Sequence, residues 1–356
     1  MKKLTIYILI KLLILFNMNC SKKENTTTTI TNNNNKPDAK TENIEILDQE
    51  QYERDIVDAN FDLICKVELG DEMVFKPYFC EFDNAGNIYI MDYSSFLIHK
   101  FSLNNNEEKK YSHSVFGKGE GLGPGEFSNP TDFKIYKNKI YIANPPTGAV
   151  EIYSTEGNYL KRIKPSEEFI PDRVAIIGNK LILKPQSLIN NDPFYAYSYS
   201  GNFLFSFGAL IDKTNKSGLY HSSYIFQINE NSFYYLPLYL GFIGLYQNEN
   251  LVFAKATIDG LKQPKLIKKN VLNGMVATKV QEEYITASHY ACNDSYLILR
   301  SVSKNENKTL HDVYSVDSFD YLYTLKNFPS GYHFDIHENY LACIDKFSLR
   351  VYKYSF

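Results

Sequence analysis

The chain has 356 residues, of which 44% are hydrophobic and 15% aromatic, including 29 tyrosines and 24 phenylalanines. This composition is ample for a large packed core, and aromatic rings suit β-strands because they cover a pleated surface well. The formal net charge is only −3 and no basic stripe stands out, so nucleic acid is not an expected partner. The absence of tryptophan removes the strongest sugar-stacking side chain, although tyrosine can take that role.

The first 19 residues have the pattern of a secretory signal. A positive start, Met1–Lys3, precedes a mostly apolar run of 13 residues, Leu4–Phe16. This run is shorter than the roughly 20 residues that a membrane-spanning helix needs. With Cys20 directly after it, the segment resembles a bacterial lipoprotein signal, which implies that Cys20 is lipidated. Asn17 and Asn19 depart from the usual lipoprotein pattern, so an ordinary secreted or periplasmic protein is the alternative.

Residues 20–58 are predicted to form a flexible tether. The runs Thr26–Thr29 and Asn32–Asn35 have no hydrophobic periodicity and cannot bury enough apolar area to offset chain entropy. Such a leash would hold a folded body away from a membrane surface. We therefore expect a protein of the bacterial cell envelope, in the outer membrane or periplasm, that touches the membrane through its lipid anchor only.

A short apolar triplet recurs six times in the rest of the chain. The triplets are Ile88–Ile90, Ile140–Ile142, Leu181–Leu183, Phe233–Tyr235, Tyr296–Ile298 and Tyr340–Ala342, and their starts differ by 52, 41, 52, 63 and 44 residues. A recurrence of roughly 40–50 residues built of short strands is typical of a β-propeller, in which each repeat is one four-stranded blade. We predict an all-β, six-bladed propeller over residues 59–356. Seven blades would require one hidden in the 63-residue interval.

The two ends of this region predict how the ring closes. Only 24 residues follow Tyr332, which is enough for three strands rather than four. The strand-like segment Phe61–Leu69, which precedes the first repeat, can supply the missing outer strand. Pairing the two ends in this way closes the ring and leaves no open sheet edge.

A glycine-rich loop, residues 116–133, joins the first two repeats. It lacks the G-x-G-x-x-G spacing and the G-K-[ST] ending of phosphate-binding loops, and it connects two blades rather than a strand and a helix. Its segment Gly123–Phe127, followed by Pro130 and by the strand at Ile140–Asn144, resembles the NHL-repeat signature. The whole chain looks like the six-bladed propeller lipoproteins of Bacteroidota and similar bacteria. The resemblance implies a fold and a location more than an activity, and we expect Phe127 to pack between adjacent blades.

Four further cysteines, Cys65, Cys80, Cys292 and Cys343, lie inside apolar strand patterns. They have no C-x-x-C spacing and no nearby pair of histidines of the zinc-binding type. We interpret them as small buried strand residues, although an oxidising compartment permits disulfides. Cys65 and Cys343 are the pair to test, because both fall in the closing blade.

Polar side chains recur near the start of each predicted inner strand: Glu81, Asp132, Asp172, Gln227, His289 and His333. Because inner strands converge on the central channel of a propeller, these residues form a candidate ligand-binding site at the channel mouth. Carboxylates and imidazoles could hold a divalent cation such as Ca²⁺ or Zn²⁺, which could polarise an ester or lactone carbonyl. The simpler interpretation is that they line a wet channel and bond to strand ends.

No Ser-His-Asp or Cys-His order can be assembled from the spacing, so no catalytic residue is assigned. The favoured hypothesis is a membrane-tethered, non-enzymatic propeller that binds an envelope protein, peptide or glycan. We expect aromatic-rich segments such as Asp192–Tyr199, with Tyr195 and Tyr197, to contact the ligand. The alternative is a metal-dependent hydrolase or lyase. It would resemble gluconolactonase-like hydrolases or NHL-type peptide lyases, although the E-G-P opening and the ordered histidines of those enzymes are missing here.

Overall fold

The computed structural model describes residues 46–355 apart from 71–73, 75, 104–110, 167–168, 187–191, 209–221, 262–265, 271–275, 281–287 and 304–307. The predicted signal, Cys20 and the tether up to residue 45 lie outside the described residues. So does most of the segment 208–220, which has no clear periodicity. Within the described ranges, no helix is long and apolar enough to cross a membrane.

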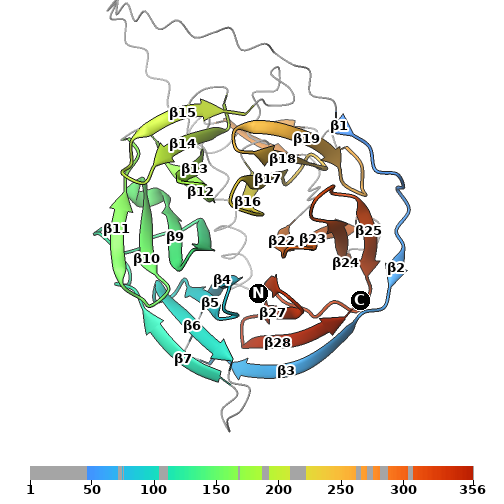
Figure 1. The fold of residues 1–356 in the computed structure, drawn as a ribbon, viewed down its shortest axis with the longest axis horizontal. Helices are drawn as coiled ribbons and strands as arrows, with labels where there is room; N and C mark the ends of the chain where they lie inside the picture. Colours follow the sequence, from blue (N-terminus) through green and yellow to red (C-terminus); the bar gives the residue numbers. More distant parts are fainter. Residues whose placement is uncertain are drawn as a thin grey trace, which may run out of the picture. The chain divides into compact units, whose positions relative to one another are not determined.

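Six sheets stand around a common axis, each with four antiparallel strands, and two of them carry a fifth strand that runs parallel to its neighbour (Figure 1). The innermost strands are β4 (Pro77–Phe82), β8 (Asp132–Tyr136), β12 (Pro171–Ile177), β16 (Ser223–Gln227), β22 (His289–Cys292) and β26 (His333–His337). The second strands are β5 (Ile88–Asp92), β9 (Lys139–Asn144), β13 (Lys180–Pro185), β17 (Ser232–Pro237), β23 (Tyr296–Ser303) and β27 (Tyr340–Ile344). Every predicted triplet lies in one of these second strands. The prediction of an all-β, six-bladed propeller is confirmed.

The outer half of each blade is an antiparallel strand pair. The third strands are β6 (Leu97–Leu103), β10 (Ala149–Ser154), β14 (Phe194–Ser198), β18 (Phe242–Gln247), β24 (Lys308–Ser315) and β28 (Ser348–Ser355). The fourth strands are β7 (Tyr111–Phe116), β11 (Tyr159–Ile163), β15 (Phe203–Phe207), β19 (Asn250–Ala256), β25 (Tyr321–Leu325) and β3 (Asn60–Glu68). A separate unit contains the two-stranded hairpin of β20 (Leu266–Asn270) and β21 (Val276–Val280).

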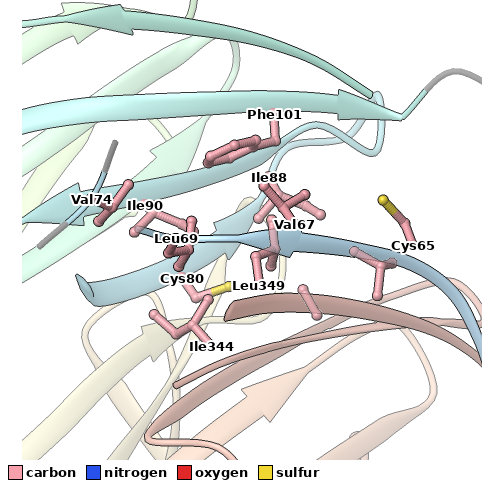
Figure 2. Close-up of a cluster of buried hydrophobic side chains, with 12 residues drawn as sticks. Cys65, Val67, Leu69, Val74, Cys80, Ile88, Ile90, Phe101, Ile344 and Leu349 are labelled. Carbon is pink, nitrogen blue, oxygen red and sulfur yellow. The ribbon is translucent and has the colours of Figure 1, made fainter. Parts of the chain in front are cut away.

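The ring closes through β3, which comes from the N-terminal side of the chain and pairs with β28 of the last blade. The buried side chains of β3, including Val67, join a cluster with Ile88 of the first blade and Leu349 of the last (Figure 2). Burying such aliphatic side chains contributes about 1.5–3 kcal/mol each. The predicted closure is therefore present, and apolar contacts hold the first and last blades together across the junction.

Residues 46–58 form a strap along the rim, although the sequence predicts a flexible tether there. Within the strap, β1 (Ile46–Leu47) runs parallel to β19 and β2 (Ile56–Val57) runs parallel to β25 (Figure 1). The buried Gln49 donates to the carbonyls of Ala256 and Phe319 at 2.7 and 2.9 Å. Arg54 pairs with the buried Asp312 at 2.9 Å. The strap thus belts two blades before β3 closes the ring.

The glycine-rich loop is fastened by buried contacts to the second blade. Phe127 is fully buried in a cluster drawn from the first two blades, as its sequence context predicts. Glu151 is also fully buried and accepts hydrogen bonds from the Gly125 backbone at 3.1 Å and from Arg162 at 2.6 Å. Arg162 in turn donates to the Gly123 carbonyl at 2.7 Å. Glu151 and Arg162 therefore give the loop its shape, which is consistent with a structural role.

The four described cysteines are free thiols. Cys65 and Cys343 do lie in the same blade, on β3 and β27, but β28 runs between those strands. Burial raises the pKa of the Cys343 thiol to about 12, so it stays protonated and unreactive. The interpretation of these residues as small buried strand residues agrees with this arrangement.

Replacing Gly125 by alanine should destabilise the fold more than the same change at Gly178. Both glycines have positive φ, +84° and +58°, which costs an alanine about 1 kcal/mol. At Gly125 the new Cβ would also lie 2.8 Å from Tyr153 Oη, whereas nothing lies within 4 Å at Gly178. Urea unfolding should show an additional loss of about 1–3 kcal/mol for Gly125→Ala. Equal losses of stability in the two variants would show that the loop can shift to accommodate the new Cβ without cost.

Removing the charge of Arg54 should show that the strap contributes to stability. Arg54→Met leaves the Asp312 carboxylate buried without a cation, which should cost about 3 kcal/mol in chemical unfolding. The matched control is Lys66→Met, because both partners of the Lys66–Glu68 pair are exposed, at 49% and 68%. The control should change stability by no more than about 0.5 kcal/mol. If the strap has no stabilising role, the two variants should have equal free energies of unfolding.

Candidate functional site

Three carboxyl groups on inner strands accept hydrogen bonds from the backbone of the next blade. Asp335 accepts from the Phe82 N–H at 2.8 Å, Glu81 from Ile135 at 3.1 Å, and Asp132 from Val174 at 2.8 Å. His289 also contacts the next blade, with its Nε2 2.8 Å from the oxygen and 3.2 Å from the nitrogen of Phe334. We call these contacts inter-blade brackets. They occupy Glu81, Asp132 and His289, three of the six residues predicted to form a site.

Lys134 lies between two of these carboxylates. Its Nζ is 2.5 Å from Glu81 and 3.5 Å from Asp132, and it stands 5.3 Å from the centre of the Tyr290 ring. Burial acts to lower the pKa of Lys134, but Asp132 and Glu81 outweigh it and raise that pKa well above its ordinary value. Lys134 therefore remains charged and neutralises the pair of carboxylates.

Asp172 is the centre of a second charged group. Its Oδ2 lies 2.8 Å from the buried Lys184 Nζ, and its Oδ1 lies 3.3 Å from Arg173 Nη1. The Arg173 guanidinium also stands 5.4 Å from the centre of the Tyr224 ring, a cation–π distance. Two cations thus share this carboxylate.

The two predicted histidines come together on the other side. The rings of His289 and His333 are 4.9 Å apart, and Tyr78 contacts His333 at the same distance. Burial lowers the pKa of His289 well below its ordinary value, so the ring is neutral at physiological pH. Gln227 does not join this group, because its amide donates to the Asn229 carbonyl at 3.0 Å in its own turn.

These residues do not fit the cation that the sequence suggests. Across the described parts of the chain, no group of three or more histidine, cysteine, aspartate or glutamate side chains is arranged to hold a metal ion. The oxygens of Glu81 and Asp132 face the Lys134 ammonium and backbone N–H groups instead. The predicted site residues therefore gather about the axis as brackets and ion pairs rather than as a ligand shell.

Tyr195 and Tyr197 are buried, which contradicts the prediction that they contact a ligand. Both lie in β14, are only 5% and 4% exposed, and pack edge-to-face against Phe169. The sequence of Asp192–Tyr199 predicts an aromatic-rich loop because its tyrosines are close together. They are buried because β14 is the third strand of a blade that is covered on both sides.

Exposed apolar side chains gather at the end of the ring where the inner strands begin, which we call the loop face. Because strands alternate in direction, the connections between blades and those between second and third strands all lie at this end. Its large exposed side chains are Tyr78 (38%), Leu122 (60%), Ile170 (38%), Tyr332 (60%) and Phe347 (66%). In the described turns at the opposite end, no large hydrophobic side chain is exposed. The two faces of the ring therefore differ in chemistry.

The fold and this arrangement define a six-bladed β-propeller with an apolar loop face and an axis filled by ion pairs. No family model matches the chain. A Caenorhabditis elegans protein named as a probable peptidyl-α-hydroxyglycine α-amidating lyase is 26% identical over 129 residues, which are 33% of this chain and 35% of that protein. The match thus spans about a third of that relative.

Among solved structures, a candidate exported protein from Bacteroides fragilis matches with a TM-score of 0.57 and 12% identity, covering 88% of this chain and 99% of that one. Virginiamycin B lyase from Staphylococcus aureus matches with a TM-score of 0.45 and 12% identity, covering 80% and 82%. The first likeness shows a shared propeller fold. Neither assigns an activity.

Asp335→Asn should remove a pH dependence of stability. Burial and then Glu81 raise the pKa of Asp335 to about 8, so the folded protein keeps a proton that the unfolded chain releases near pH 4. Stability therefore falls as pH rises. Relative to the variant, the wild type should lose about 1.4 kcal/mol for each pH unit between roughly 5 and 8.

Chemical unfolding at several pH values measures this difference, with Asp320→Asn as the control. Hydrogen bonds from Lys255 and then Ser318 lower the pKa of Asp320, so it stays ionised throughout this range. The control should run parallel to the wild type between pH 5 and 8. Parallel curves for Asp335→Asn as well would contradict a proton held on Asp335.

Proposed function

We propose that this protein is a cell-envelope β-propeller that binds a protein, peptide or glycan through its loop face, without catalysis. The exposed apolar side chains of that face carry the proposal. Five large side chains, one near the start of β4 and four in separate connections, are 38% to 66% exposed at one end of the ring. Contiguous exposed apolar surface marks interaction sites, and loops on a rigid scaffold are where binding residues concentrate.

The hydrogen bonds that the side chains at the axis already make favour binding over catalysis. Glu81, Asp132 and His289 already have partners in the inter-blade brackets. A general base or a metal ligand would have to give up such a bond, and a buried polar group left unpaired costs about 1–3 kcal/mol. The axis therefore supports the ring, while the loop face is free to meet a ligand.

Attachment to the membrane through a lipid at Cys20 is part of this proposal. Its support is the signal-like segment 1–19 and the Thr- and Asn-rich stretch that follows it. Labelling with a radioactive fatty acid, followed by comparison with Cys20→Ser, tests the anchor directly.

A second candidate is a lyase, which the partial match to the amidating lyase favours. The test is turnover of a peptidyl-α-hydroxyglycine by the purified protein with each of Ca²⁺, Zn²⁺, Mg²⁺ and Mn²⁺. Turnover that is lost in Asp132→Asn would establish the lyase and contradict the non-enzymatic proposal.

Replacing Tyr332 and Phe347 by alanine should weaken ligand binding without unfolding the protein. Both side chains are at least 60% exposed, so their loss should change stability by no more than about 0.5 kcal/mol. Hits from peptide and glycan arrays should bind the double variant about tenfold less tightly, since each exposed aromatic ring would be covered in the complex. Binding is then quantified by calorimetry.

The matched control replaces Phe203 and Val252, which are 55% and 54% exposed on outer strands of the rim. This control should bind like the wild type. If the rim variant loses binding and the loop-face variant keeps it, the ligand sits on the rim and the proposed face is incorrect.

A further inference from the structure

Arg300 is the exception among the arginines of this chain. The chain has five arginines, all in the described ranges. The other four pair with carboxylates: Arg54 with Asp312 at 2.9 Å, Arg162 with Glu151 at 2.6 Å, Arg173 with Asp172 at 3.3 Å and Arg350 with Asp345 at 2.9 Å. Arg300 has no carboxylate partner among the described residues. Its Nε donates to Ser288 Oγ and its Nη1 to the Gly331 carbonyl, both at 2.9 Å.

These two bonds hold the guanidinium but do not balance its charge. Burial is the main cause that lowers the pKa of Arg300, and a buried cation without a counter-ion is costly to keep. The Nη2 atom makes no hydrogen bond to a described residue, and it is not among the buried atoms that lack a partner. One edge of the fork is therefore open to solvent and can receive an acceptor.

A second cation stands close to the same place. The Tyr224 hydroxyl donates to the Ser288 carbonyl at 3.2 Å, while Ser288 Oγ accepts from Arg300. The Arg173 guanidinium stands 5.4 Å from the centre of the same Tyr224 ring, and the charges of both Arg173 and Arg300 act on Tyr224. Positive charge is therefore concentrated near Arg300. Such charge attracts an oxyanion, to which the open edge of the Arg300 guanidinium can donate.

The surroundings favour a single negative charge. Asp172 and Asp132 act on Arg173 from the same side of the axis, and they would repel a doubly charged phosphate more strongly than a carboxylate. His289, whose pKa burial lowers, and His333 stand on the opposite side. Tyr332, which is 60% exposed, directly follows the Gly331 that accepts from Arg300. An apolar or aromatic group next to the carboxylate would therefore meet an exposed ring.

We propose that Arg300 binds the terminal carboxylate of a peptide whose last side chain is aromatic or apolar, with Arg173 adding positive charge nearby. A chain end has a residue on one side of its carboxylate only, whereas a carboxylate within a polysaccharide has a neighbouring sugar on both sides. This inference rests on the proposed function, because it names the ligand of the loop face and the group that the ligand presents.

The first test needs no variant. Thermal melting of the wild-type protein is followed with N-acetyltyrosine and with N-acetyltyrosine amide, which differ in the carboxylate alone. A ligand that binds only the folded state raises the melting temperature by mass action. The acid should raise it in a concentration-dependent way and the amide should not. Equal shifts, or no shift with the acid up to millimolar concentration, would overturn the carboxylate site.

The second test assigns the site to Arg300. Calorimetry compares hexapeptides ending in tyrosine, with a free or an amidated terminus, on the wild type, Arg300→Gln and the control Arg350→Gln. The wild type should prefer the free acid by about tenfold, since bidentate Arg–carboxylate bonds are about twice as strong as neutral ones. Arg300→Gln should lose this preference and still bind the amide, and Arg350→Gln should keep it. An unchanged preference in Arg300→Gln would exclude Arg300.

The two proposals can fail separately. If peptides bind through Tyr332 and Phe347 but acid and amide bind equally, the loop face stands and the carboxylate site falls. If an oligosaccharide of glucuronic acid binds in an Arg300-dependent way and the peptides do not bind, the peptide assignment is overturned.

Discussion

Closing a ring of blades leaves the inner edge of each first strand without a neighbouring strand, and this edge is the constraint on which the structure depends. Backbone N–H groups on such an edge must find another acceptor or remain unsatisfied. Here Asp335, Glu81 and Asp132 supply it to the blade that follows, and His289 contacts the backbone of its next blade through its imidazole. Each bracket satisfies an edge and fixes one blade against the next. Polar residues are therefore required at the axis whether or not a ligand binds there.

The brackets also determine the electrostatics of the axis. Carboxylates placed so close together need compensation, and Lys134 provides it for Glu81 and Asp132. Lys184 and Arg173 do so for Asp172. Blades four and five are joined differently: Phe226 stacks on Tyr290 at 4.0 Å, and no carboxyl group of the described residues brackets that junction. Arg300 lies in blade five, next to this junction, which explains why no described carboxylate balances its charge.

The sequence predicts the fold well because the signals of the fold are local and repeated. Apolar triplets mark the second strands, and the shortage of residues after Tyr332 indicates that the ring closes with an N-terminal strand. The sequence predicts where the site residues lie in the fold, but not which contacts they make. Glu81 and Asp132 are recognisable as inner-strand residues, whereas the backbone N–H groups that donate to them lie 54 and 42 residues further along the chain. Such spacings depend on how one blade is offset from the next, which no local pattern encodes.

Other residues escaped prediction for different physical reasons. Arg173 and Lys184 follow Asp172 within two adjacent strands, yet a search for metal ligands passes over cations. Basic residues in otherwise apolar inner strands were the signal that could have revealed them. The strap was missed because its binding residues, Gln49 and Arg54, are polar and match no periodic pattern. Its order comes from contacts with blades that are 200 or more residues away.

The strap also determines how the ring would respond to mechanical load. Any force applied to the chain before residue 46 enters the fold at β19 and β25, not at the strand pair that closes the ring. The bonds of Gln49 and the ion pair of Arg54 must break first, and only then does tension reach β3. The strap therefore takes up the load before it reaches the strand pair that closes the ring.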